Sequence, residues 1–176
     1  MKNKTTVHLV QGAVIAALYI VINYSQELLF PTSTTMAVQF RIAEVLCLLA
    51  CYTTSAIGGL TLGCFVANFI SIGTLPLDWA MGSVATLLAA LSMYALRNVR
   101  WFGLPVLSSL MPALFNGIII GLEIEIFFVE GGFHLMSFLV NAGLVALGEL
   151  GVCVVLGLPF SKLIERLPIA KDNPDS

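Results

Sequence analysis

Basic side chains are almost absent from two long stretches of this 176-residue chain. Arg41 is the one Lys or Arg between Lys4 and Arg97. None occurs between Arg100 and Lys162. Only 10% of the residues are charged and the mean hydropathy is +0.98, whereas soluble domains carry about 25% charged residues. Because so few charges cannot cover the surface of a chain in water, we predict an integral membrane protein.

The apolar residues fall into six segments separated by clusters of Pro, Gly, Ser, Thr and Asn. A spanning helix needs about 20 residues, so six helices use about 120 residues and leave only short loops. No small-x-small cleavage site follows the first segment, so it is interpreted as a helix of the mature protein rather than a signal peptide. We predict an all-α integral membrane protein, a single domain over 1–176 that forms a compact bundle of six transmembrane helices at 7–27, 38–53, 55–73, 77–97, 104–128 and 135–157, with a short cytoplasmic tail at 158–176.

Positive charge is confined to one side of this predicted bundle. With six helices, the two termini and the connections near 54 and 100 share a side, and that side holds seven of the eight basic residues. The loops of the opposite side contain no Lys or Arg, and that side holds four acidic residues: Glu27, Asp78, Glu125 and Glu130. Because Lys and Arg are enriched in cytoplasmic loops, both termini are predicted to be cytoplasmic.

Polar residues within the segments gather in the outer half of the bundle or near its midplane. An ionisable side chain near the bilayer centre costs about 2.5–3.5 kcal/mol on insertion scales, and it usually faces water or a partner. Asn116 and Glu123 are seven residues apart and therefore lie on one face of their helix. A common depth for so many polar groups predicts a binding pocket open to the outside, lined by Gln39, Arg41, Glu44, Asn68, Asp78, Trp79, Asn116, Glu123, Asn141 and Glu149.

Several of these residues also fit purely structural roles. Arg41 and Glu44 are one helical turn apart and suit an ion pair. Asn68 or Asn141 suits a hydrogen bond between helices. Asp78 suits a cap at the start of its helix. Three acidic residues near the outer loops are interpreted as solvated charges: Glu27, Glu125 and Glu130.

Small residues recur at four-residue spacing in three of the segments. The first segment carries two interleaved pairs, Gly12 with Ala16 and Ala13 with Ala17. Such spacing lets helices approach closely in a membrane. The first segment therefore has a patch wide enough for a neighbouring helix and for an outside partner. Internal packing is expected for the remaining small residues: Gly59, Gly63, Ala67, Ala85 and Ala89.

No motif for catalysis or nucleotide binding accompanies the predicted pocket. A Walker-type glycine loop, a Gly-x-Ser-x-Gly sequence and a His-Glu-x-x-His sequence are all absent. His8 and His134 fall on opposite sides of the bundle, and no basic patch suits nucleic acid. Buried Cys behaves as a small hydrophobe, and this is the role expected for Cys47, Cys51, Cys64 and Cys153. We expect a binding protein with no catalytic residue, no metal and no cofactor.

Five stretches, in this order, resemble a known family: QFRIAEVL, GLTLGCFVANFIS, PLDWAMGSVATLLAAL, FNGIIIGLE and ALGELGVCVVLGLP. Over residues 8–166 the chain is similar to the queuosine-precursor transporter (QueT) family. These proteins are substrate-binding S components of energy-coupling factor (ECF) transporters, which are ABC importers. The resemblance implies a multi-pass protein of the bacterial cell membrane that captures its substrate from outside. It also implies docking on a transmembrane coupling protein and two ATPase subunits, which hydrolyse the ATP.

The resemblance implies roles for two parts of the chain. The small-residue motif of the family corresponds to Ala13 and Ala17, beside Gly12 and Ala16, and would contact the coupling protein. The loop at 25–38 would be a lid over the site, with a Ser/Thr-rich stretch at 32–35. The sequence EGGFH after the fifth segment departs from the family pattern, so the outer rim is not predicted.

The implied substrate is a 7-deazaguanine: 7-aminomethyl-7-deazaguanine, its 7-cyano relative or queuine. The guanine-like edge carries adjacent N–H donors, which Glu44 or Glu149 would accept. The carbonyl and ring nitrogens would bind the side-chain amides of Asn68, Asn116 and Gln39.

The remainder of the substrate would use a second group of residues. Glu123 or Asp78 would bind a cationic aminomethyl arm. Trp79 or Tyr24 would stack on the flat bicycle. Arg41 is expected to orient its neighbouring carboxylate rather than to touch the substrate.

The residues also leave other functions open. The first is an S component for another small vitamin-like heterocycle. The second is an oligomeric channel or facilitator that works without ATPase partners, in which the small patch of the first segment is a self-association face. The third is a membrane enzyme acting on lipid through Glu44 or Glu149, although no nucleophile or metal set accompanies these carboxylates.

Overall fold

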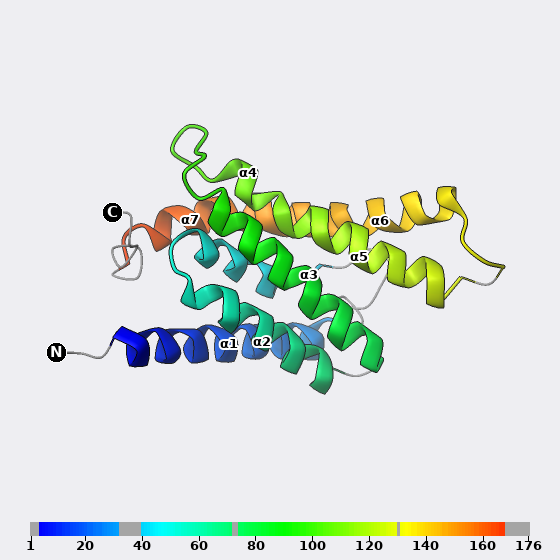
Figure 1. Ribbon diagram of the computed structural model, residues 1–176, viewed down its shortest axis with the longest axis horizontal. Helices are drawn as coiled ribbons and strands as arrows, with labels where there is room; N and C mark the ends of the chain where they lie inside the picture. Colours follow the sequence, from blue (N-terminus) through cyan, green and yellow to red (C-terminus); the bar gives the residue numbers. More distant parts are fainter. Residues whose placement is uncertain (1–3, 32–39, 72–73, 130, 168–176) are drawn as a thin grey trace.

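Regular structure in this protein is entirely helical within the residues that the computed structural model describes, which are 4–31, 40–71, 74–129 and 131–167 (Figure 1). The predicted all-α class is therefore confirmed. The elements are α1 (Lys4–Leu29), η1 (Ile42–Cys51), α2 (Ser55–Ile70), α3 (Pro76–Ala95), α4 (Val106–Ser109), α5 (Met111–Phe127), α6 (Leu135–Leu150), η2 (Gly151–Leu156) and α7 (Gly157–Ile164).

Four helical stretches of the described chain are long and apolar enough to cross a membrane: Lys4–Leu29, Pro76–Ala95, Val106–Phe127 and Leu135–Ile164. The helices Ile42–Cys51 and Ser55–Ile70 are apolar but shorter. Large exposed side chains are mostly Leu, Val, Ile and Phe. Such a surface is favourable against lipid chains and unfavourable against water.

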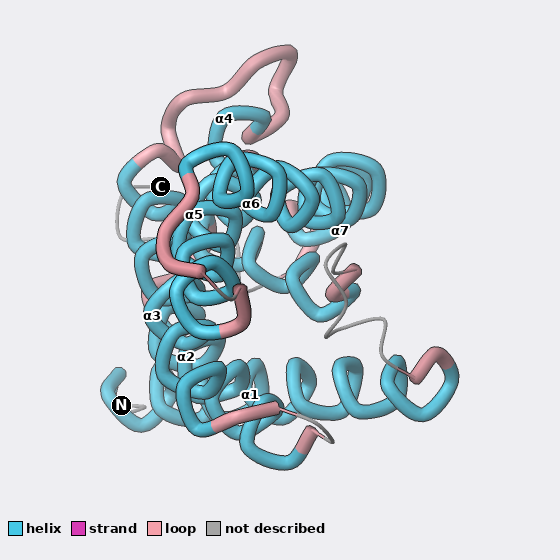
Figure 2. The backbone as a smooth tube through the Cα atoms, turned by 90° about the vertical axis from the view of Figure 1, so that its right-hand side faces the viewer, coloured by secondary structure: helices cyan, strands magenta, loops and turns pink. Residues whose placement is uncertain are grey.

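The helices form a curved layer around a buried segment. Along this layer α1 packs on α2, α2 on α3, α3 on α5 and α5 on α6. Figure 2 shows the same order from one edge of the molecule to the other. The segment η1 lies inside the layer, against α1 and α3, and most of its residues are buried. The beginning of α1 and the end of α7 lie at the same end of the molecule (Figure 1).

The helix predicted at 38–53 differs from expectation. It is described from Ile42 to Cys51 and is a 3-10 helix, and bonds such as Glu44 N–H to Arg41 C=O (3.0 Å) link residues three apart. A 3-10 helix rises about 2.0 Å per residue, so this segment covers about 20 Å, less than the hydrocarbon core of about 30 Å. By its own length, η1 does not span a membrane.

Prolines explain two departures from the predicted boundaries. The helix predicted at 104–128 is interrupted at Leu110, because Pro112 has no N–H and its ring clashes with the carbonyl of Ser108. The helix predicted at 135–157 continues through the π-helix η2 into α7 and ends at Ile164, inside the predicted tail. Pro159 likewise cannot donate to the carbonyl of residue 155, and the wider π turn precedes it.

Small residues bring α1 and α2 into close contact, as predicted. A Cβ on Gly59 would lie 2.5 Å from the carbonyl oxygen of Gly12, and a Cβ on Gly63 would lie 3.1 Å from that of Ala16. The pair Gly12 and Ala16 therefore serves packing within the molecule. Ala13 and Ala17, one position further along, are exposed.

Candidate functional site

One face of α1 sets the position of the segment that enters η1. Its buried residues recur every three or four positions, which is one helical face: Ile15, Tyr19, Asn23 and Gln26. The amide of Gln26 donates to the carbonyl of Phe40, and its oxygen accepts from the N–H of Ile42 at 2.8 Å. This two-sided bond fixes the backbone on either side of Arg41. The charged start of η1 is thereby held against α1.

Glu44 is fully buried and has a donor on each carboxylate oxygen. The hydroxyl of Tyr19 donates to Oε1 at 2.5 Å, and the thiol of Cys47 donates to Oε2 at 2.8 Å. The ion pair between Arg41 and Glu44, one of the two roles that the sequence suited, is not formed within the described part of the chain. Tyr19 and Cys47, rather than Arg41, orient this carboxylate.

Arg41 lies at the centre of the buried charges. Its side chain is buried, and its Nε has no hydrogen-bond partner among the described residues. It interacts electrostatically with Glu44 of η1 and Glu149 of α6. The backbone of Gly82 on α3 also lies close to this group, because a Cβ there would be 2.7 Å from Nδ2 of Asn68 and in van der Waals contact, at 3.7 Å, with Nη1 of Arg41. Three elements thus converge on one guanidinium.

Glu149 differs from Glu44 in its surroundings. It is fully buried, and neither of its oxygens has a hydrogen-bond partner in the described residues. The π-helix η2 begins two residues later, and the thiol of Cys153 approaches the carbonyl of Glu44 at 3.9 Å. Insertions of this kind in helices are frequent at functional sites. Here the wider turn begins close after Glu149 and contacts the backbone of Glu44.

A second group of buried polar atoms lies on α5. Asn116 and Glu123 are both buried, and their spacing places them on one face of the helix, as predicted. Both amide atoms of Asn116 and Oε1 of Glu123 lack partners in the described chain. Glu123 also faces Asp78 of α3, and the charge of Arg41 acts on it. Glu123 on α5 therefore interacts electrostatically with the buried charges around Arg41.

A sequence profile of the QueT transporter family matches residues 9–166. The chain belongs to the QueT transporter family. A protein named queuosine precursor transporter QueT, from Lactococcus lactis subsp. cremoris (strain MG1363), is 28% identical over 178 residues, covering 97% of this chain and 100% of that protein. No solved structure matches the chain significantly. The resemblance inferred from sequence is confirmed, and with its apolar helices this QueT family member is a multi-pass membrane transporter.

In this QueT family member, some predicted site residues bond to their own protein on α2 and α3. The amide of Asn68 donates to the carbonyl of Asp78 at 3.3 Å, which joins α2 to α3. Asp78 accepts from the N–H of Leu75 at 2.6 Å and so caps α3. Trp79 donates to Thr74 at 3.3 Å. Its ring also makes an edge contact with Phe69, so in this structure the indole packs within the α2–α3 connection.

The outer end of α5 and α6 contains a correction. Glu125, interpreted from sequence as a solvated charge, is fully buried. It accepts from the backbone N–H of His134 at 2.9 Å and from the amide of Asn141 at 3.3 Å. Gly131 and Gly132, with φ of 103° and 91°, form the intervening turn in a conformation that favours glycine. Asn141 therefore holds this turn to α5 through Glu125, and residues 131–134 form the described rim of the α5–α6 end.

The predicted residues of this QueT transporter thus divide into two groups. Buried polar atoms without a partner in the described chain occur on Arg41, Asn116, Glu123 and Glu149. Protein partners occupy Glu44, Asn68, Asp78, Trp79 and Asn141. Gln39 and residues 32–38 of the predicted lid lie outside the described residues. Tyr19 and Cys47 were missed because their residue types suit an apolar core, although Tyr19 lies four positions from other buried residues of α1.

Proposed function

We propose that this chain is the substrate-binding S component of an ECF importer, which captures a 7-deazaguanine precursor of queuosine from outside. Its membership of the QueT transporter family supports the transport role. The structural support is the set of buried polar atoms that have no partner in the described chain. Buried polar groups in native proteins are normally hydrogen-bonded. A polar ligand that satisfies these atoms is therefore the simplest explanation for their burial.

Glu149 is the best-supported contact for the guanine-like edge of the substrate. Both of its oxygens are unoccupied by described residues, so it can accept two adjacent N–H donors. Glu44 is a weaker candidate than the sequence indicated, because Tyr19 and Cys47 already donate to it. The amide of Asn116 can donate to the substrate carbonyl. Glu123, with Asp78 beside it, suits a cationic aminomethyl arm.

The remaining predicted contacts stay part of the proposal with less support. Trp79 or Tyr24 would stack on the bicycle, and amide contacts would come from Gln39, Asn68 and Asn141. Asn68, Trp79 and Asn141 would need to leave their present partners. Tyr24 is exposed on α1, and Gln39 lies in the part of the chain that is not described. Arg41 would balance the charge of the carboxylates around it.

Coupling to partner subunits is proposed for the exposed face of α1. Ala13 and Ala17 are exposed, and a groove of about 530 Å³ between α1 and the beginning of α2 lies beside Ala13. Its walls include Gly12, Ala16 and Gly58, which expose backbone that another helix can approach closely. A transmembrane coupling protein with two ATPase subunits would dock here. In the same proposal the shorter helices complete six membrane segments, and both termini are cytoplasmic in the bacterial cell membrane.

Calorimetric titration of the purified protein in detergent tests the substrate. The titrants are 7-aminomethyl-7-deazaguanine, the 7-cyano form and queuine, with guanine as the comparison. We expect one-to-one binding of at least one 7-substituted compound, and loss of that binding in Glu149→Gln. Glu165→Gln, at the end of α7, is the control that keeps binding. Absence of heat with folded protein would reject the substrate assignment and leave the architecture unaffected.

A further inference from the structure

The connection between α3 and α4 ends in a tight turn of unusual composition. The backbones of Trp101 and Leu104 exchange two hydrogen bonds of 2.9 Å each. The residues between them, Phe102 and Gly103, have φ of 51° and 76°. Positive φ at both central positions is the type I′ pattern, which favours Gly, Asn or Asp. A phenylalanine with positive φ is a genuine outlier, and this one is 100% exposed.

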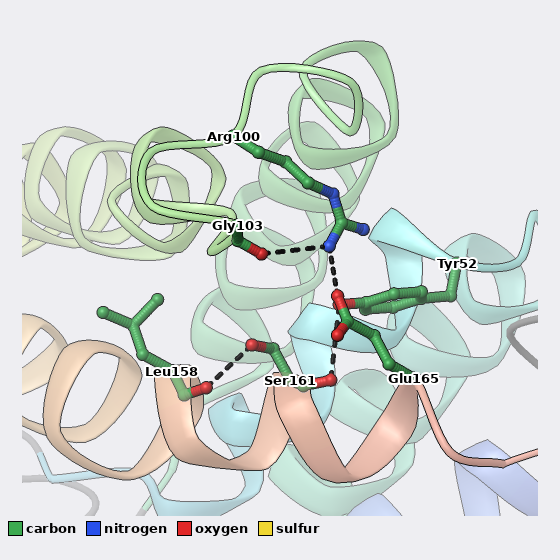
Figure 3. Close-up of polar contacts among 6 residues, drawn as sticks. All are labelled: Tyr52, Arg100, Gly103, Leu158, Ser161 and Glu165. Atoms are coloured by element: carbon green, nitrogen blue, oxygen red, sulfur yellow. Dashed lines mark hydrogen bonds and ion pairs between the residues drawn. The ribbon is translucent and has the colours of Figure 1, made fainter.

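The base of this turn is fixed to two other elements (Figure 3). Arg100 donates to the carbonyl of Gly103 at 3.3 Å and forms an ion pair with Glu165 after α7. Its guanidinium also lies over the ring of Tyr52, 5.3 Å from the centroid. The hydroxyl of Tyr52 donates to the carbonyl of Ser161 at 3.4 Å. The turn is therefore held in a defined direction rather than collapsed on the bundle.

The side chains presented by the turn are apolar. Trp101 is 70% exposed, and Val99 and Leu107 are also exposed. Val99, Trp101 and Leu107 line a hollow of about 310 Å³. Figures 1 and 2 both show the loop projecting sideways from the helices, at the end where α1 begins and α7 ends. The aromatic tip thus points into the space that surrounds the bundle.

We propose that this turn is an interfacial anchor, in which Trp101 and Phe102 insert into the boundary between lipid headgroups and acyl chains. Three observations favour lipid over a protein partner. The turn joins two stretches that are long enough to span the membrane, so it lies at the depth of a span's end. It projects sideways, where lipid surrounds a membrane protein. Trp beside Arg is the composition typical of that boundary.

Depth-dependent fluorescence quenching tests the anchor and does not depend on what the pocket binds. The chain has two tryptophans, so Trp79→Phe leaves Trp101 as the single fluorophore. This variant is reconstituted into vesicles of phosphatidylcholine and phosphatidylglycerol. The phosphatidylcholine is brominated either near the headgroup or near the chain ends. We expect stronger quenching of Trp101 by the shallow bromines than by the deep ones.

A matched control is Trp101→Phe, which leaves Trp79 at the opposite end of α3. A second variant, Phe102→Ser in the Trp79→Phe background, is expected to shift the Trp101 emission to longer wavelength and to reduce the shallow quenching. Unquenched emission typical of an indole in water would overturn the proposal. Blue-shifted emission that is seen only after ATPase and coupling subunits are added would overturn it as well, in favour of a protein partner.

Discussion

Two fully buried carboxylates near Arg41 differ in what holds them. Glu44 receives two hydrogen bonds from Tyr19 and Cys47, whereas neither oxygen of Glu149 has a partner in the described chain. A satisfied carboxylate contributes to the fold, and an unsatisfied one costs free energy until something binds it. The two residues have the same type and burial, and they are expected to respond in opposite ways to the same substitution.

Glu149→Gln is expected to weaken substrate binding without weakening the fold. Hydrogen bonds to a charged group contribute about 1.5–3 kcal/mol, which corresponds to a loss of about 10- to 150-fold in affinity. The ligand-free protein should unfold at the same or a higher temperature, because Glu149 has no hydrogen bond to the described chain to lose and a neutral amide is easier to bury than a carboxylate. Titration calorimetry and thermal unfolding in detergent measure the two effects. Glu44→Gln is the comparison and should lower the unfolding temperature.

Tyr19→Phe should destabilise the fold, because it leaves an oxygen of Glu44 buried without its donor. The expected loss is about 1–3 kcal/mol in the free energy of unfolding. Tyr24→Phe on the same helix is the matched control, since that side chain is 44% exposed. Equal stability of the two variants in a denaturation series would show that the Tyr19 hydroxyl does not hold Glu44.

Phe102→Asn should relieve backbone strain, because Asn tolerates positive φ better than a bulky side chain. A strained non-glycine residue of this kind costs about 1–3 kcal/mol, so the variant is expected to be more stable in detergent by up to about that amount. Phe128→Asn is the control, because that phenylalanine is also exposed but has φ of −117°. A gain in unfolding temperature for both variants, or for neither, would contradict the strain argument.

At the scale of the element, α1 has two different small-residue faces. Gly12 and Ala16 contact α2, where backbone atoms are close to Gly59 and Gly63. Ala13 and Ala17 are rotated away and exposed. A single helix therefore joins the buried site, through Tyr19, to the face proposed for partner docking.

Ala17→Trp should abolish uptake in cells that contain the ATPase and coupling subunits, while substrate binding by the purified protein stays unchanged. Gly63→Trp on the packed side of α2 should instead lower the unfolding temperature, since even a Cβ there would lie 2.9 Å from the side chain of Tyr19. Uptake assays and calorimetry on both variants separate docking from folding. Normal uptake by a folded Ala17→Trp protein would exclude this face as the docking surface.

The elements show which parts of this fold are predictable from sequence. Long apolar stretches predicted the four helices that are long enough to cross a membrane, because hydrophobic length is visible in the sequence. The first three agree within three residues at each end, whereas the last continues beyond 157 to Ile164. The 3-10 form of η1 was not predicted, since apolar composition carries no information on whether hydrogen bonds link residues three or four apart. Pro112 and Pro159 were visible signals for the interruptions near 110 and 157.

Within the candidate site, residue type and predicted depth in the membrane identified the buried polar residues. Their partners depend on packing, as Tyr19 with Glu44 and Asn141 with Glu125 show.

At the scale of the whole molecule, ligand binding should stabilise the protein strongly. A ligand at 100 times its Kd contributes about 2.7 kcal/mol to the free energy of unfolding. Thermal unfolding with and without each 7-deazaguanine measures this effect, with guanine as the comparison. The unfolding temperature of Glu149→Gln should change little on adding the same ligand. Equal shifts for wild type and Glu149→Gln would place the ligand elsewhere on the molecule.

The buried polar atoms that have no partner in the described chain bear on how fast the protein is degraded in a cell. Folded chains that lose even 1–2 kcal/mol of stability, as order-of-magnitude values, are removed by proteases several times more often. Under the proposed function, in which the substrate satisfies the buried polar atoms, the chain is protected while substrate is plentiful and is degraded faster when substrate is scarce. We expect the amount of this transporter in the membrane to follow the supply of its substrate, with no change in the rate of its synthesis.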